Sequence, residues 1–132
     1  MTKEINSGVN MYDFNRANMG KLPVLTTPEE LAGAQSVVIR FLEQHPAKYY
    51  MLLNHENKYF TVFNFANDGS FATQKQTMAQ DVIECMENCD FNIIDICPDS
   101  FGGALEVWVK DLDTESVHMY LLFPYDFGVI EY

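Results

Sequence analysis

The clearest hydrophobic pattern in the chain lies in residues 27–45, where apolar side chains recur every three or four positions. That spacing places them on one face of a helix. Thr27 is a favourable N-cap, Pro28 suits the first helical position, and Glu30 stands at the capping-box distance from Thr27. Pro46 ends the pattern, because proline disfavours a helical residue before it. We therefore expect a helix in this segment.

A second helical pattern runs from about residue 74 to 88. Its apolar stripe comprises Met78, Val82, Cys85, Met86 and Cys89. Elsewhere, β-branched and aromatic residues form short runs between turn residues, which is typical of strands. The predicted strands span residues 48–53, 58–65, 91–97, 104–110 and 117–123. Residues 125–132 are a candidate for a further short strand.

The first two predicted strands, 48–53 and 58–65, are apolar on both sides, which is typical of central strands or of strands covered on both faces. Hairpin-length connections between strands predict a mostly antiparallel sheet. We expect a two-layer α+β fold of about five strands with two helices on one face, in the order arm-αββαβββ. Residues 1–132 form one domain in this interpretation, and residues 1–26 are an N-terminal arm docked on the body.

Charge is distributed unevenly between the two parts of the chain. The formal net charge is −11, yet residues 1–70 hold seven acids and six bases, whereas residues 71–132 hold twelve acids and two bases. A protein that binds nucleic acid directly needs clustered Lys and Arg, so this class is disfavoured. The asymmetry predicts one face with a strong negative potential, although acids that only keep the protein in solution are an alternative explanation.

Two groups of residues are candidates for a protein-binding surface. The acidic candidates, on the outer side of the second helix and at the last hairpin tip, are Asp81, Glu84, Glu87, Asp111, Asp113 and Glu115. The second candidate is an aromatic patch on the solvent face of the last hairpin, formed by Trp108, Tyr120 and His118 with Glu106 at its rim. Aromatic anchors with a polar rim are typical of interfaces.

The N-terminal arm offers an alternative for this aromatic patch. The arm is rich in apolar side chains, and Met11, Tyr12 and Phe14 are available to cover the patch within the same chain. The two alternatives differ in whether Trp108 is exposed.

Cysteine and histidine residues allow a zinc site to be considered. Cys85, Cys89 and Cys97, together with one of His45, His55 or His118, would supply enough ligands. The first two cysteines lie in the apolar helix stripe, however, and free cysteine usually behaves as a small buried hydrophobe. We expect no metal ion and no cofactor.

A calcium loop and a catalytic site are also disfavoured. Residues 111–115 resemble the start of an EF-hand loop, but Ser116 stands where glycine is needed and Leu122 where glutamate is needed. The chain contains no G-x-S-x-G, P-loop or G-x-G-x-x-G motif. A pair formed by Cys97 and His118 would be compatible with the predicted sheet, so a small enzyme or ligand binder remains the third alternative.

The odd number of cysteines and the lack of an apolar leader or span predict a cytoplasmic protein without membrane contact. The first functional hypothesis is a protein-binding module that engages a basic nucleic-acid-binding enzyme by mimicking nucleic acid. In size, charge and lack of catalytic motifs, the chain is similar to small inhibitors from phages and mobile elements, including anti-CRISPR proteins. The second hypothesis is an oligomeric adaptor subunit, such as a homodimer that buries Trp108 and Tyr120.

Overall fold

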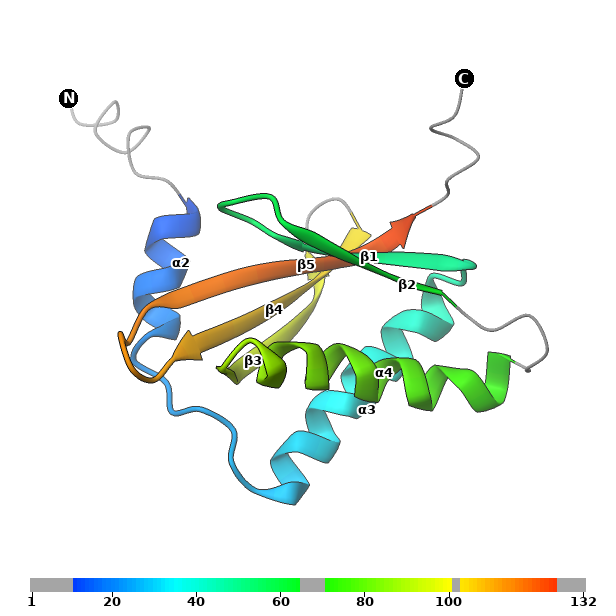
Figure 1. The fold of residues 1–132 in the computed structure, drawn as a ribbon, viewed down its shortest axis with the longest axis horizontal. Coiled ribbons are helices and arrows are strands. Elements are labelled where there is room, and N and C mark those ends of the chain that lie inside the picture. The colour runs from blue at the N-terminus through cyan, green and yellow to red at the C-terminus, as the bar shows by residue number, and fades with distance from the viewer. Residues whose placement is uncertain (1–10, 65–70, 101–102, 126–132) are drawn as a thin grey trace.

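The structure is a computed structural model that describes residues 11–64, 71–100 and 103–125. Its helices are α2 (Met11–Met19), α3 (Pro28–Gln44) and α4 (Phe71–Asn88). Its strands are β1 (Tyr49–Asn54), β2 (Phe60–Asn64), β3 (Phe91–Ser100), β4 (Ala104–Asp111) and β5 (Val117–Tyr125). The predicted α+β class and the order of the main elements are confirmed (Figure 1). The candidate strand at 125–132 lies outside the described residues, apart from Tyr125.

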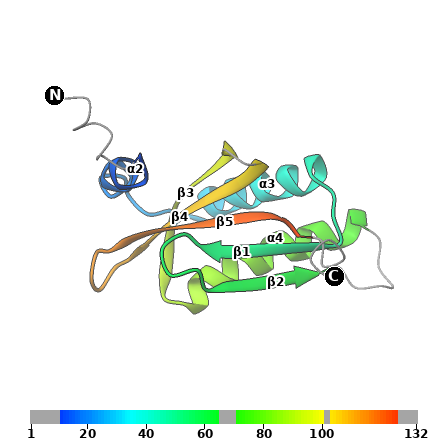
Figure 2. The same cartoon turned by 90° about the horizontal axis from the view of Figure 1, so that it is seen from above.

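The five strands form one antiparallel sheet in the order β2-β1-β5-β4-β3. Helices α3 and α4 cover one face of this sheet, which we call the helix face, as seen in Figures 1 and 2. We call the opposite face the outer face. The predicted arrangement of two helices on one side of an antiparallel sheet is therefore confirmed.

The main core lies between the two helices and the helix face of the sheet. Val38 and Leu42 of α3 and Val82 of α4 are fully buried against strand residues such as Leu105 and Leu122. Burying side chains of this size contributes about 1.5–3 kcal/mol each. A smaller cluster on the outer face consists of Ile94, Trp108, Val117 and Met119.

Helix α3 begins and ends close to its predicted limits. Thr27 accepts a hydrogen bond from the Glu30 amide at 3.1 Å, and the Glu30 carboxylate accepts one from the Thr27 amide at 3.1 Å. This reciprocal pair is the capping box predicted from the sequence. Helix α4 begins earlier than predicted, at Phe71. Cys89, which we expected in its apolar stripe, is exposed because it lies one residue beyond the helix end.

One of the two apolar strands differs from expectation in its position in the sheet. β1 lies between β2 and β5, but β2 is an edge strand. The prediction that segment 58–65 is central or covered was therefore wrong for β2. Tyr59, just before the strand, is 78% exposed and Phe60 is 58% exposed. The physical reason is the connection through α4, which carries the chain from one edge of the sheet to the other.

The described part of the N-terminal arm contains helix α2. Helix α2 lies against β5, and Met19 and Val24 pack on the outer-face cluster. Residues 1–10 lie outside the described part of the chain. Within the described residues, no helix combines the length and hydropathy that a membrane crossing needs.

Candidate functional site

Four exposed carboxylates follow helix α4 at intervals of three residues: Asp81, Glu84, Glu87 and Asp90. Each three-residue step rises about 4.5 Å along the helix axis and falls about 60° short of a full turn, so Asp81, Glu84 and Glu87 wind gradually around the exposed side of α4. Asp90 follows the helix end in the left-handed conformation, with φ 65°, which Asp tolerates better than most residues. Asp90 was not among the acids predicted for this surface, although the constant spacing of the preceding acids was the available signal.

The turn between β4 and β5 supplies the other acidic side chains. The Asp111 carboxylate accepts hydrogen bonds from the amides of Asp113 at 2.9 Å and Thr114 at 3.4 Å. These bonds close the turn on itself, as Asp side chains often do. Asp113 and Glu115 remain exposed at the tip. The acid-rich segment is therefore a hairpin turn. This agrees with the sequence, which lacks the glycine and the glutamate that a calcium loop needs.

The end of α4 and this turn meet around a shallow hollow of about 490 Å³. Glu87, Asp90, Asp111 and Asp113 all line it, and Phe91 is also part of its wall. The structure thus brings together residues that are more than twenty positions apart in the chain. We call the whole set the acidic surface: Asp81, Glu84, Glu87, Asp90, Asp111, Asp113 and Glu115.

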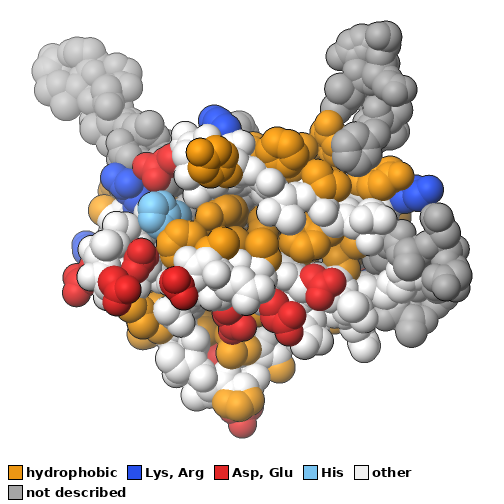
Figure 3. All heavy atoms as spheres, viewed as in Figure 1, with side chains coloured by type: hydrophobic (Ala, Val, Ile, Leu, Met, Phe, Trp, Pro, Cys, Tyr) orange, Lys and Arg blue, Asp and Glu red, His pale blue; other side chains and the backbone are white. Residues whose placement is uncertain are grey.

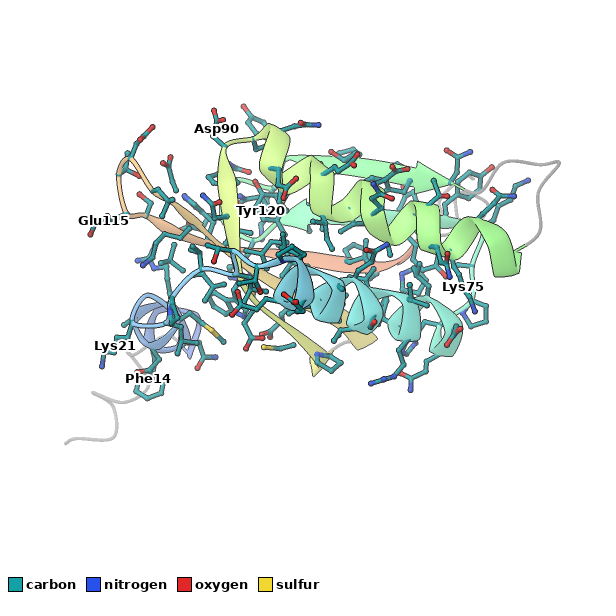
Figure 4. All side chains as sticks on the ribbon, turned by 90° about the horizontal axis from the view of Figure 1, so that it is seen from below. Phe14, Lys21, Lys75, Asp90, Glu115 and Tyr120 are labelled. Atoms are coloured by element: carbon teal, nitrogen blue, oxygen red, sulfur yellow. The ribbon has the colours of Figure 1, made fainter. Side chains whose placement is uncertain are left out.

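The acidic surface is not neutralised from within the described part of the chain. None of its seven carboxylates has a cationic partner there. The two bases of the second half of the sequence are engaged elsewhere: Lys75 pairs with Glu43, and Lys110 donates to the Gly20 carbonyl at 3.1 Å. Figure 3 shows the Asp and Glu side chains gathered over α4 and the β4–β5 turn. Figure 4 shows Asp90 and Glu115 toward the same end of the molecule.

The proposed aromatic patch does not exist as predicted. Trp108 pairs with Met119 and Tyr120 with Val107, so Trp108 lies on the outer face and Tyr120 on the helix face. Trp108 is only 1% exposed, and its indole N–H donates to the Glu106 carboxylate at 2.9 Å. A difference of one residue in strand register moves a side chain to the other face, which explains the error.

The alternative cover for Trp108, the N-terminal arm, is found in the structure, but not through Phe14. Phe14 is 54% exposed, so it does not cover the indole. The side chains of Met11 and Tyr12 lie outside the described residues. Met19 and Val24 pack against the Trp108 cluster instead. Trp108 and Glu106 therefore stabilise this end of the sheet and are not part of the acidic surface.

The postulated pair of Cys97 and His118 is also excluded by geometry. Cys97 is opposite Glu106 on the outer face, whereas His118 packs against Phe91, with ring centres 5.1 Å apart, on the helix face. Burial, with the nearby Asp95 and Glu106 carboxylates, raises the pKa of Cys97 to about 12. The thiol therefore stays protonated at neutral pH, which is unfavourable for a nucleophile.

His118 has a different role from the one expected. Its Nδ1 lies 3.4 Å from a carboxylate oxygen of Glu56, which also pairs with Arg16 of α2 at 3.2 Å. These contacts connect β5 with the β1–β2 turn and with α2. Among the residues that the structure describes, no group of three or more His, Cys, Asp or Glu side chains is arranged to hold a metal ion.

Comparison with known proteins gives no relative: no family model, no curated protein and no solved structure matches the chain. The fold and its surface thus define an α+β protein with a five-stranded antiparallel sheet and an acidic surface over α4 and the β4–β5 turn.

Proposed function

We propose that this chain is a protein-binding module whose acidic surface engages a basic, nucleic-acid-binding enzyme. The observation that carries the proposal is the gathering of seven carboxylates, from two separate elements, without cationic partners in the described residues. Acids three residues apart on a helix repel one another and cost a few tenths of a kcal/mol per pair. Acids that only keep a protein in solution do not need this alignment, so the row on α4 favours a binding role.

Nucleic-acid mimicry is the form of binding that this surface supports. A row of carboxylates can occupy a channel lined by Lys and Arg that otherwise holds a phosphate backbone. Such a module inhibits its partner by competing with nucleic acid, as small acidic phage and mobile-element inhibitors do. It needs no cofactor and acts in the cytoplasm, where these enzymes work. The same charges repel phosphate, so the module itself does not bind nucleic acid.

Salt titration of binding tests this proposal. Purified enzymes with basic nucleic-acid channels are titrated with the protein, and the affinity is measured between about 50 and 200 mM salt. We expect the affinity to fall by roughly ten-fold or more across this range, because several charged contacts are screened. Duplex DNA should compete with the protein for the same channel.

Matched variants locate the contact on the molecule. Glu87→Gln removes one charge from the acidic surface, and Glu29→Gln removes one exposed charge from the first turn of α3, outside that surface. We expect Glu87→Gln to weaken binding by about two- to five-fold and Glu29→Gln to change it little. Affinity that is independent of salt, or failure of DNA to compete, would contradict the mimicry proposal.

A second candidate is the oligomeric adaptor. Its original form, a dimer that buries Trp108 and Tyr120, does not fit a chain in which Trp108 is already 1% exposed and faces away from Tyr120. The observation that favours an adaptor is the exposure of Tyr59 and Phe60 at the edge of the sheet. Light scattering distinguishes the candidates, because an adaptor of this kind self-associates without a partner protein.

A further inference from the structure

The two edges of the sheet differ in how well they are protected against pairing with another strand. β3 carries Asp95 and Pro98 and has two register shifts in its pairing with β4. Charges, proline and bulges are the usual means by which natural edge strands avoid further pairing. β2 has none of them: its sequence is Phe-Thr-Val-Phe-Asn, and its pairing with β1 is regular. The unprotected edge is therefore open to a further strand.

The pattern of hydrogen bonds shows which backbone groups of β2 face outward. The Asn54 amide donates to the Tyr59 carbonyl at 2.8 Å, so Tyr59 and, by alternation, Thr61 and Phe63 point their backbone groups toward β1. Phe60, Val62 and Asn64 therefore point theirs away from the sheet. Among the described residues, no strand pairs with this side of β2.

The row of carboxylates on α4 lies beside this edge. The Cys85 side chain on α4 lies near Thr61 of β2, and Figure 2 shows the helix running beside this strand. Asp81 precedes Cys85 by four residues, so the two side chains lie on the same side of α4. Glu84 comes three residues after Asp81 and is exposed to solvent. Figure 3 shows the hydrophobic side chains over β2 and the acids over α4 on one face of the molecule.

We propose that an extended, basic segment of the partner protein adds to β2 as a further antiparallel strand. Side chains of such a strand alternate between the two faces of the sheet. Lys or Arg at every second position then points toward the helix layer and the acids of α4. Apolar residues at the other positions lie beside Phe60 and Val62 on the outer face. This inference rests on the proposed function, which it deepens by naming the recognised segment.

A second copy of the chain fits this edge less well than a basic segment. Pairing two β2 strands would bring the two α4 helices, each with Asp81 and Glu84 exposed, toward each other. Like charges then oppose association, whereas a basic strand complements them. Main-chain hydrogen bonds supply affinity in this mode, and the alternate side chains supply specificity.

A synthetic peptide provides a direct test with the full-length protein. The probe is a peptide of about ten residues that alternates Lys with Val or Thr, and the control has the same composition with all Lys residues at one end. We expect the alternating peptide to bind at least about five-fold more tightly at low salt, because only it presents its charges to one face. Hydrogen exchange should show new protection of the amides of Phe60, Val62 and Asn64.

Substitutions at one outward position separate backbone pairing from side-chain contact. Val62→Pro removes an N–H that faces away from β1, so the internal pairing keeps its bonds, and proline is tolerated at edge strands in this orientation. Val62→Thr keeps the N–H and the size of the side chain. We expect Val62→Pro to weaken peptide binding at least about ten-fold and Val62→Thr to weaken it less than about three-fold. Circular dichroism verifies that both variants are folded.

Paired charge variants test the contribution of α4. The double variant Asp81→Asn with Glu84→Gln should weaken the peptide about five-fold at low salt. The double variant Asp113→Asn with Glu115→Gln removes the same charge at the β4–β5 turn and should have a smaller effect.

Each result bears on the inference separately from the proposed function. If a basic enzyme binds through the acids but Val62→Pro binds it as well as the wild type, the strand addition is wrong and the proposed function stands. If the peptide protects the outward amides but no basic enzyme competes with DNA, the edge site stands and mimicry is wrong. Protection of these amides without peptide, in a dimer, would assign the edge to a second copy and overturn the inference.

Discussion

The hydroxyl of Tyr50 connects strand β1 with the residues at the end of helix α3. The side chain is 0% exposed. Its hydroxyl donates to the His45 carbonyl at 2.7 Å and accepts from the Ala47 amide at 3.0 Å, and the Leu42 carbonyl lies 3.5 Å from the same oxygen. Tyr50→Phe removes this oxygen alone, and the ring can remain in place.

The expected cost follows from the partners that lose this hydroxyl. A hydrogen bond contributes about 0.5–1.5 kcal/mol net, and a buried group left without a partner costs about 1–3 kcal/mol. The Ala47 amide and the His45 carbonyl are only partly buried, so water can replace some of the loss. We therefore expect Tyr50→Phe to lower the free energy of unfolding by about 2 kcal/mol, at the middle of this range. For a chain of this length that corresponds to a fall in Tm of roughly 6–10 °C.

Urea unfolding followed by far-UV circular dichroism measures this effect, with the slope of the transition as a test that the unfolded state is unchanged. Tyr59→Phe is the matched control, because Tyr59 is 78% exposed and no partner of its hydroxyl occurs among the described residues. A loss below about 0.5 kcal/mol in Tyr50→Phe, or equal losses in both variants, would refute the assigned role of the hydroxyl.

Four further predictions concern the acids, the tryptophan and the cysteines. Asp81→Asn with Glu84→Gln should raise the free energy of unfolding by about 0.3–0.5 kcal/mol at low salt, and the gain should vanish at high salt; a loss at low salt would contradict repulsion within the row. Trp108→Ala should lower the free energy of unfolding by about 3–5 kcal/mol. Fluorescence of the wild-type Trp108 should resist quenching by iodide, and emission typical of an exposed indole would disprove its burial. Cys89, which is exposed, should react with a thiol reagent near neutral pH much faster than Cys97; equal rates would be inconsistent with a Cys97 pKa of about 12. Because the folded chain retains the Cys97 proton that an unfolded thiol releases at its ordinary pKa of 9.0, the free energy of unfolding should fall as pH rises from 9 toward 12, and Cys97→Ser should flatten this fall.

Part of the candidate surface was predictable from neighbouring residues alone. The acids of α4 follow one another at a helical spacing, so their common exposed side could be predicted once the helix was recognised. Their meeting with Asp111 and Asp113 around one hollow depends on where the β4–β5 turn lies relative to the end of α4. The same limit applies to the edge site, because the exposure of β2 depends on the order of strands in the sheet.

Features that depend on residues within a few positions of each other follow from the local sequence. Helix α3 begins at the Thr27–Glu30 capping box and ends before Pro46 because these interactions are local. Tertiary structure decided which face each strand residue occupies and which strand lies at the edge. Trp108 and Tyr120 show the reason: alternation along a strand has a period of two, and the face that becomes buried is chosen by strands and helices distant in the chain.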